Sequence, residues 1–234
     1  MELFDLKGKT AVVTGAGTGI GKAAAELLAK AGATVSRIDI EKGPGILEGD
    51  VADEAAMEKL FAQVGGVDVL VNNAGIAVRK HSLNIERAEW DRVMAVNVDG
   101  LFLCARIAAR SMKQRGGGSI VNLASIMGFS GGIYPNPAYQ ASKGAVVNLT
   151  RALAMEFAAD NIRVNAVAPT WVKTRLTQPL FDNPETFRKV MAHAPLGRLP
   201  ETGDIAAAIL YLASPAARCV TGITLPVDSG YLAV

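Results

Sequence analysis

Hydrophobic and polar residues in the N-terminal part of the chain follow the periods of a strand, a helix and a second strand. The short apolar run Thr10 to Thr14 is typical of a parallel strand covered on both faces. From Ile20 to Ala31 the apolar residues have the i, i+3, i+4, i+7 spacing of an amphipathic helix, and Gly32 follows as its C-terminal cap. A second strand is predicted at Thr34 to Ile40. The pattern predicts that the chain begins as a βαβ unit.

The same alternation of strands and helices continues to the end of the chain. Further strands are predicted at Val67 to Asn72, Ser119 to Ala124, Arg163 to Ala168 and Ile223 to Val227. Helices are predicted from the cap Asp53 to Val64, over Ala88 to Arg115 with a kink near Asn97 and Gly100, around and after Tyr139, and over Glu201 to Ala213. Because no internal repeat or linker interrupts this order, we predict a single α/β domain over residues 1–234.

Two segments depart from the regular pattern. Glu41 to Gly49 contains Gly43-Pro44-Gly45, which cannot propagate a helix, so we expect the usual crossover helix to be missing before a short strand ending at Asp50-Val51. Thr170 to Pro200 is irregular and rich in proline, with a short helix predicted near Glu185 to Ala192. Segments this long and irregular are usually functional lids or disordered stretches, and the aromatic and aliphatic residues here favour a substrate lid at about 170–200.

Composition narrows the classes of partner. The chain has 234 residues, 50% of them hydrophobic, and a net charge of only +2 without a lysine or arginine block, which disfavours nucleic acid or an anionic membrane as a partner. No apolar run approaches ~18 residues, the length of a membrane span. The N-terminus lacks the pattern of a signal peptide. We therefore expect a cytoplasmic protein.

The two cysteines, Cys104 and Cys219, lie in apolar surroundings without metal-type spacing. We interpret both as buried free thiols of a reducing compartment, and we predict no metal site.

A glycine-rich stretch follows the first predicted strand and opens the first predicted helix. Gly15, Gly19 and Gly21 allow the backbone to approach a pyrophosphate, and the helix N-terminus offers unpaired N–H groups. Asp39, near the end of the second strand, can accept hydrogen bonds from the adenosine ribose and would repel a 2′-phosphate. Arg37 is expected to face a sheet edge or solvent. The stretch predicts a dinucleotide site that favours NAD over NADP.

Candidate proton-transfer chemistry lies at Tyr139 and Lys143, which are four residues apart on a predicted helix and so share one face. The lysine cation is expected to favour the phenolate and to lower the pKa of Tyr139. Ser125, at the carboxyl end of the fifth strand, can hydrogen-bond a substrate carbonyl or alcohol oxygen. The set suits the interconversion of an alcohol and a ketone.

Together these motifs identify a family. The chain resembles the short-chain dehydrogenase/reductase family over Leu6 to Gly230. The matching positions are Thr14, Gly15, Gly19, Gly21, Asn72-Asn73-Ala74-Gly75, Asn97, Ser125, Tyr139, Lys143 and the segment Pro169 to Thr174. The resemblance implies a Rossmann-type, doubly wound, seven-stranded parallel sheet of order 3-2-1-4-5-6-7. It also implies a homo-oligomer, commonly a tetramer, built partly on the helices around Asn97 and Tyr139.

The resemblance also implies roles for individual residues. Tyr139 would be the general acid/base, Ser125 would hold the substrate oxygen, and Lys143 would bond the nicotinamide ribose. Asn97 would hold a water that continues the proton relay. The cofactor contacts implied are Gly15, Thr18, Gly19, Ile20, Gly21, Asp39, Asp50, Val51, Asn73, Ala74, Gly75, Tyr139, Lys143, Pro169, Val172 and Thr174.

Three features differ from the family pattern. The interval from Ser125 to Tyr139 is one residue longer than expected, which should bulge the loop Ser130 to Pro137 over the substrate pocket. Thr170 stands where the family usually has glycine. The shortened 41–49 link alters the adenine side of the site.

The substrate is a small-molecule alcohol or ketone. The basic residues Arg79, Lys80, His81, Lys173, Arg175 and His193 either attract an anionic substrate such as a sugar acid or are ordinary solvated loop residues. The segment from Thr174 to Leu180 resembles the sugar-acid and polyol dehydrogenases of the family. A 3-oxoacyl-thioester reductase and a non-catalytic NAD-binding sensor are the alternatives.

Overall fold

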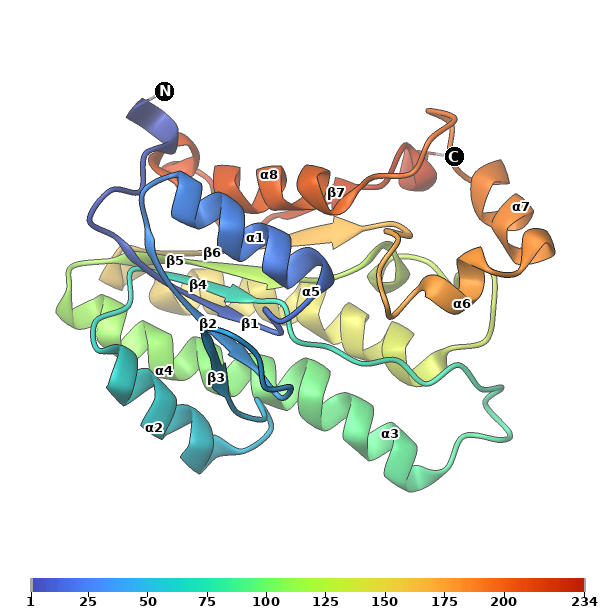
Figure 1. Ribbon diagram of the computed structural model, residues 1–234, viewed down its shortest axis with the longest axis horizontal. Coiled ribbons are helices and arrows are strands. Elements are labelled where there is room, and N and C mark those ends of the chain that lie inside the picture. Colours follow the sequence, from blue (N-terminus) through green and yellow to red (C-terminus); the bar gives the residue numbers. More distant parts are fainter. Residues whose placement is uncertain (1, 234) are drawn as a thin grey trace.

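The computed structural model describes residues 2–233 and is organised around one parallel sheet of seven strands (Figure 1). The spatial order β3-β2-β1-β4-β5-β6-β7 confirms the predicted topology. The strands are β1 (Thr10–Thr14), β2 (Thr34–Asp39), β3 (Ile46–Glu48), β4 (Val69–Asn72), β5 (Gly118–Leu123), β6 (Ile162–Pro169) and β7 (Thr224–Val227). Neighbouring strands pair in parallel throughout, for example Ala11 with Val35 and with Val69.

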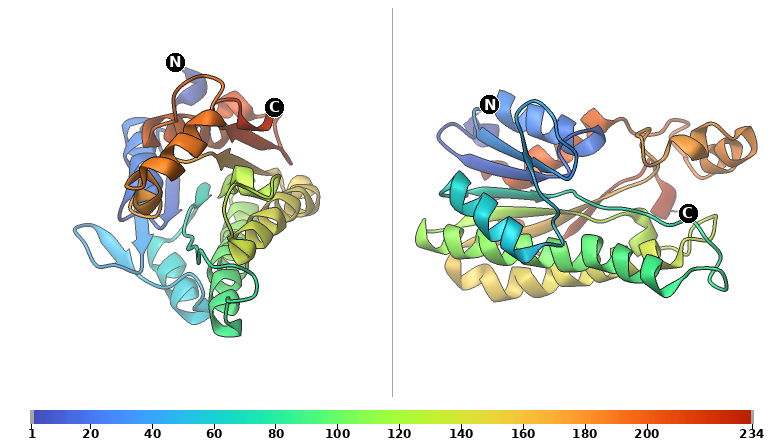
Figure 2. Two further views of the ribbon diagram at one scale, coloured as in Figure 1. Left: turned by 90° about the vertical axis from the view of Figure 1, so that its right-hand side faces the viewer. Right: turned by 60° about the horizontal axis from the view of Figure 1, so that its bottom comes forward.

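Helices cover both faces of the sheet. They are α1 (Gly19–Lys30), α2 (Glu54–Val64), α3 (Arg87–Met94), α4 (Gly100–Gln114), α5 (Pro137–Phe157), α6 (Gln178–Phe181), α7 (Pro184–Ala192) and α8 (Thr202–Ala213). Figures 1 and 2 show α1 and α8 on one face and α2, α4 and α5 on the other. One apolar core joins α1 and α8 to the sheet, and a second joins the sheet to the opposite helices. The three layers give the doubly wound arrangement that was predicted.

The long helical stretch is interrupted where the sequence places a kink. A π-helical turn, Ala95–Asp99, separates α3 from α4, and Asn97 is buried within it. π-Helical turns are rare in proteins, and those that occur often lie at functional sites. Asp53 caps α2 as predicted, because its carboxylate accepts a hydrogen bond from Ala56 N at 3.0 Å.

The connection between β2 and β3 contains no helix, as predicted from its glycines and proline. β3 still pairs in parallel with β2, with Asp39 opposite Glu48. It ends at Glu48, two residues before the predicted position. Asp50 and Val51 therefore lie in the turn that follows β3.

One sequence-based expectation about a side chain is wrong: Cys104 is buried as expected, but Cys219 is exposed. Arg37 is only partly buried, and its guanidinium donates to the Ala16 carbonyl at 3.3 and 3.1 Å, so it contacts the glycine-rich loop. Strand alternation gives the face of a residue such as Arg37, but not what covers that face.

Residues 170–200 extend from the carboxyl end of β6, and Figures 1 and 2 show α6 and α7 projecting beyond the sheet there. Trp171 anchors this segment: it is buried, it lies edge-on to Tyr231 at 5.3 Å, and its indole N–H donates to Tyr134 Oη at 3.3 Å. The segment is packed against the body of the protein at its base. Within residues 2–233, no helix has both the length and the apolar character to cross a bilayer.

Candidate active site

A cavity of about 610 Å³ opens along the carboxyl ends of the strands and brings most of the predicted site residues together. It is lined by three of the four predicted catalytic residues, Ser125, Tyr139 and Lys143. It is also lined by the predicted cofactor residues Gly15, Thr18, Gly19, Ile20, Asp39, Asp50, Val51, Asn73, Ala74, Gly75, Pro169, Val172 and Thr174. Asn97 and Gly21 stand behind its wall. This is the edge where ligands of open α/β sheets bind.

The glycine-rich loop is packed too closely for side chains. A Cβ atom at Gly15 would lie 2.8 Å from Ala74 Cα, and one at Gly21 would overlap the Gly15 carbonyl. Gly15 and Gly19 also have positive φ angles of 62° and 56°. Gly21 therefore acts by letting α1 pack on the loop, while Gly15 and Gly19 face the cavity at the N-terminus of that helix.

Thr14 and Asn73 hold the loop against β4. The buried Thr14 hydroxyl accepts hydrogen bonds from Asn73 N at 3.1 Å and Ala74 N at 3.2 Å. The Asn73 amide in turn donates to the carbonyls of Thr14 and Gly15 at 3.0 and 2.8 Å. These bonds fix the positions of Asn73 and Ala74 along the cavity wall, so a ligand there meets a preformed surface.

Asp39 lies at the end of β2 with its carboxylate directed at the loop. It accepts hydrogen bonds from Gly17 N at 2.8 Å and from Glu41 N at 3.0 Å. A Cβ atom at Gly17 would lie 2.9 Å from this carboxylate, so the glycine is needed for the contact. The two backbone bonds hold a negative charge at the edge of the cavity.

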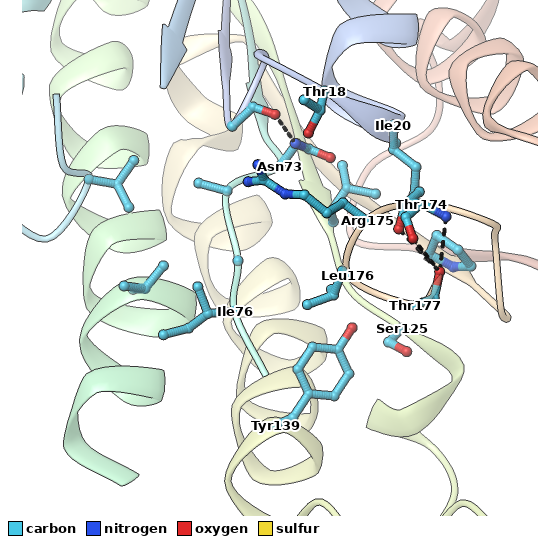
Figure 3. A pocket seen from close by; sticks show the side chains of 18 of the residues that line it. Thr18, Ile20, Asn73, Ile76, Ser125, Tyr139, Thr174, Arg175, Leu176 and Thr177 are labelled. Atoms are coloured by element: carbon cyan, nitrogen blue, oxygen red, sulfur yellow. Dashed lines mark hydrogen bonds between the residues drawn. The ribbon is translucent and has the colours of Figure 1, made fainter. Parts of the chain in front are cut away.

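Ser125, Tyr139 and Lys143 converge at the other end of the cavity. Figure 3 shows the Tyr139 hydroxyl pointing into it, with Ser125 close by. Lys143 Nζ is buried one helical turn from Tyr139, 5.6 Å from the centroid of its ring, and donates to the Leu123 carbonyl at 2.5 Å. The predicted i, i+4 arrangement is confirmed, and Ser125 joins it from the end of β5.

Burial dominates the electrostatics of this pair. It raises the pKa of Tyr139 to about 12, while the Ser125 hydroxyl and the charge of Arg79 act in the opposite direction. It lowers the pKa of Lys143 to about 8. The sequence-based expectation of a lowered Tyr139 pKa is therefore wrong, because desolvation of the phenol outweighs the Ser125 hydrogen bond and the charge of Arg79.

Asn97 is a structural centre behind the cavity. Its amide donates to the Ile76 carbonyl and to Ser142 Oγ, both at 3.0 Å, and its oxygen accepts from Ile76 N at 2.9 Å. These bonds tie the loop after β4 to α5 and so fix the distance between Gly75 and Lys143. Both the nitrogen and the oxygen of the Asn97 side-chain amide therefore make hydrogen bonds within the protein.

On the side of the cavity near β2 and β3, the wall is formed by Asp50, Val51 and Arg92. Partial burial acts to raise the pKa of Asp50, but hydrogen bonds from Ala52 N and Arg92 hold it below its ordinary value. Arg92 reaches Asp50 at 2.7 Å from α3. The sequence did not identify Arg92, because its partner lies forty-two residues away and on a different element.

Two arginines of the cavity wall connect residues 170–200 to the rest of the protein. Arg175 forms a two-pronged ion pair with Glu41 at 2.9 and 2.7 Å, and Figure 3 shows its side chain extending across the pocket. Arg79 donates to the Leu176 carbonyl at 2.8 Å. The sequence places both arginines only in a set of basic residues, and no local pattern marks Glu41 as the partner of Arg175.

These residues fit a bound nicotinamide dinucleotide. The glycine-rich loop and the N-terminus of α1 offer N–H groups for a pyrophosphate, and the close approach of Gly15 to Ala74 leaves that surface free of side chains. Asp39 offers acceptors for ribose hydroxyls, and Tyr139 and Lys143 lie at the opposite end of the same cavity. Asp39, the glycine-rich loop and the Tyr139–Lys143 pair thus lie along the cavity in the order of the cofactor's adenosine ribose, pyrophosphate and nicotinamide ends.

Comparison with known proteins identifies the family. Residues 15–232 match a family described as enoyl-(acyl carrier protein) reductase. The chain belongs to the short-chain dehydrogenase/reductase family. It is 45% identical over 98% of its length to galactitol 2-dehydrogenase (L-tagatose-forming) of Cereibacter sphaeroides, of which it covers 97%. It is 38% identical over its whole length to 2-dehydro-3-deoxy-D-gluconate 5-dehydrogenase of Dickeya dadantii, of which it covers 99%.

Solved structures of this family have the same fold. One example is gluconate 5-dehydrogenase of Burkholderia cenocepacia in complex with NADP and tartrate, with a TM-score of 0.93 and 34% identity. That comparison covers 100% of this chain and 98% of the other. The chain is thus an oxidoreductase of the short-chain dehydrogenase/reductase family, and its relatives act on polyols and sugar acids.

Proposed function

We propose that the protein is an NAD(H)-dependent dehydrogenase that interconverts a secondary alcohol and a ketone on a polyol or sugar acid. One observation carries the proposal: Ser125, Tyr139 and Lys143 line the same cavity as the glycine-rich loop and Asp39. A substrate oxygen beside Tyr139 would thus lie at the nicotinamide end of a dinucleotide held by the loop. The named activities of the galactitol and gluconate relatives support the substrate class.

The chain's own residues would move the proton. The bound dinucleotide accepts or donates the hydride. In alcohol oxidation the deprotonated Tyr139 oxygen accepts the hydroxyl proton of the substrate, and in ketone reduction the phenol donates it. Ser125 orients the substrate oxygen beside the phenol. Lys143 places a positive charge 5.6 Å from the ring centroid, which favours the phenolate when it forms.

The preference for NAD rests on the charges around Asp39. Arg37 is held by the Ala16 carbonyl, and Arg175 is paired with Glu41. Both nearby cations therefore have partners, while the Asp39 carboxylate faces the cavity, where it would repel a 2′-phosphate. The Burkholderia neighbour is described with NADP, so the two cofactors must be compared directly for this protein.

We also propose that residues 170–200 act as a lid and that the protein is a homotetramer. The Arg175–Glu41 pair and the Arg79–Leu176 bond support the first, because they join this segment to both sides of the cavity. Exposed apolar side chains, Met155 on α5 and Phe102 on α4, support the second. Light scattering coupled to size-exclusion chromatography measures the oligomer, and a monomeric mass contradicts the tetramer.

Reduced-nicotinamide absorbance tests the enzymatic proposal. The protein receives NAD or NADP with galactitol, D-gluconate or a 3-hydroxyacyl thioester. Tyr139→Phe is expected to lose turnover while still binding NADH, whereas Tyr211→Phe, a matched change on α8, is expected to retain it. Equal turnover by both variants contradicts the role of Tyr139. NADH binding without turnover on any substrate favours the non-catalytic sensor instead.

A further inference from the structure

Arg79 and Asn136 line a small chamber beside Tyr139, and each carries a buried side-chain atom without a hydrogen-bond partner. These atoms are the donor Nε of Arg79 and the acceptor Oδ1 of Asn136, and neither has a partner within residues 2–233. The chamber has a volume of about 50 Å³ and adjoins the main cavity through Ser125 and Tyr139. Buried polar atoms are nearly always hydrogen-bonded, so an unpaired donor and an unpaired acceptor on two residues of one chamber call for an explanation.

Arg79 supplies a positive charge to the chamber. One of its terminal nitrogens donates to the Leu176 carbonyl at 2.8 Å, and the guanidinium lies 6.0 Å from the centroid of the Tyr134 ring. Within the described residues, no carboxylate lies within ion-pair distance of Arg79. Its charge acts on the reacting group, because it lowers the pKa of Tyr139 against the effect of burial. A guanidinium with a free buried N–H recognises an anionic oxygen, above all a carboxylate.

Asn136 supplies the complementary acceptor. It is only 2% exposed and occupies the N-cap position of α5, yet its side chain makes no capping bond. Its orphaned oxygen needs an N–H or O–H donor. A substrate hydroxyl meets that need, so the chamber offers a donor to a carboxylate and an acceptor to a hydroxyl.

Three of the other five basic candidates have partners elsewhere. Lys80 pairs with Glu89 at 2.6 Å, Arg175 pairs with Glu41, and the His193 ring bonds the Lys189 carbonyl at 2.8 Å. Of the six basic residues that the sequence offered, only Arg79 lines the chamber. The anionic-substrate interpretation therefore depends on one residue.

We propose that Arg79 and Asn136 form a hydroxy-acid subsite that binds the substrate's carboxylate and a hydroxyl on the same side of the reacting carbon. The inference rests on the proposed function and narrows it from polyols and sugar acids to sugar acids. The volume suits this, because 50 Å³ is several times the ~10–15 Å³ that a cavity needs by this measure to hold one water molecule, so it accommodates a carboxylate. Tyr134 and Trp171 enclose the subsite, which strengthens its electrostatic interactions.

The first test compares an acid with an uncharged polyol. The value of kcat/KM is measured for D-gluconate and for galactitol with wild type, Arg79→Met and the control Lys80→Met, which removes the same charge from the adjacent, exposed position. Arg79→Met is expected to lose about 10- to 100-fold more kcat/KM on gluconate than on galactitol, the scale of a charge-assisted hydrogen bond, because the effect of its charge on Tyr139 is common to both substrates. Equal losses on both substrates, or an equal loss in Lys80→Met, would overturn the proposal.

Asn136 is tested by two substitutions. Asn136→Ala removes the acceptor and is expected to lower kcat/KM about 3- to 10-fold on both substrates. Asn136→Asp keeps an acceptor but adds a negative charge beside the carboxylate, so it should raise KM for gluconate and leave KM for galactitol close to wild type. If Asn136→Asp raises both KM values equally, Asn136 does not share the subsite with the carboxylate.

A binding measurement separates failure of the subsite from failure of the proposed function. Trp171 lines the chamber, so its fluorescence is titrated with D-gluconate in the presence of NADH. If no substrate is turned over, the proposed function fails, yet gluconate-dependent quenching that Arg79→Met loses still supports the subsite. If galactitol is oxidised but gluconate neither binds nor reacts better than galactitol, the enzyme stands and the subsite is wrong.

Discussion

Replacing Lys143 by methionine is expected to abolish turnover and, in the cofactor-free protein, to increase stability. Lys143 is 3% exposed, and its Nζ donates one hydrogen bond within the described residues, to the Leu123 carbonyl. An ammonium group held with so little compensation costs free energy on folding. Methionine fills similar space without that charge. The lysine is therefore retained at a cost, as groups of active sites often are.

The magnitude follows from the pKa of Lys143, which burial lowers from 10.5 to about 8. A difference of about 2.5 between the unfolded and folded pKa values corresponds to about 3 kcal/mol at ~1.4 kcal/mol for each pKa unit. The substitution also leaves the Leu123 carbonyl without its donor, which destabilises the variant by about 1–3 kcal/mol. A net gain of about 1 kcal/mol remains, which raises Tm by roughly 2–4 °C for a chain of this size.

The size of this stability difference depends on pH. Below pH 8 the lysine is protonated in both folded and unfolded states, and the full cost of burial is present. As the pH rises from about 8 to about 10.5, the folded state carries fewer protons than the unfolded state, so wild type gains stability relative to Lys143→Met. The advantage of the variant should therefore shrink over that window.

Urea denaturation at pH 7, 8.5 and 9.5 measures the difference in free energy of unfolding between Lys143→Met and wild type. Lys113→Met serves as the control, because the Lys113 side chain is 66% exposed and should change stability little. A variant less stable than wild type at pH 7, with a difference that does not change with pH, would refute the assignment of Lys143 as a costly buried cation.

Three further predictions concern the cofactor and the proton. Because burial raises the pKa of Tyr139 to about 12, alcohol oxidation should accelerate up to at least pH 10 while ketone reduction stays flat; a plateau of oxidation near pH 7 contradicts this. Gly21→Ala should weaken NADH binding at least about 10-fold in a fluorescence titration, since its Cβ would overlap a loop carbonyl. Gly203→Ala, whose Cβ meets nothing within 4 Å, should not weaken it. Glu41→Gln should release Arg175 and improve NADP binding about 3- to 10-fold, a gain that adding Arg175→Gln must remove.

Much of the fold could be predicted because it depends on local patterns. The apolar run of β1, the helical spacing of α1 and the cap Asp53 each act within a few residues, and the structure confirms all three. The missing helix between β2 and β3 was predictable for the same reason, because Pro44 and its glycine neighbours exclude a helix without any tertiary contact.

The parts that could not be predicted depend on partners distant in sequence. Lys143 bonds the carbonyl of Leu123, a group that every residue carries and no sequence pattern marks. Arg37 turns to the Ala16 carbonyl, and Cys219 is exposed, because tertiary packing decides which strand and loop faces are covered. The pKa of Tyr139 moved opposite to expectation, since sequence spacing reveals the neighbouring cation but not the depth of burial.

The orphaned atoms of Arg79 and Asn136 show a further limit of the sequence. Asn136 belongs to the loop expected to bulge over the substrate pocket and Arg79 to the basic set, but only the structure reveals that both line one chamber and that each carries an unpaired buried atom. Such complementarity is a property of arrangement in space.

Hydride transfer from a deuterated substrate tests the central claim most directly. Galactitol and D-gluconate carrying deuterium at their secondary carbinol carbons are incubated with NAD and the protein, and the reduced cofactor is analysed by mass spectrometry. Wild type is expected to produce NADH that has gained one deuterium, and Tyr139→Phe is expected to produce no deuterated NADH. Reduced cofactor without deuterium, or deuterium transfer undiminished in Tyr139→Phe, would contradict the claim.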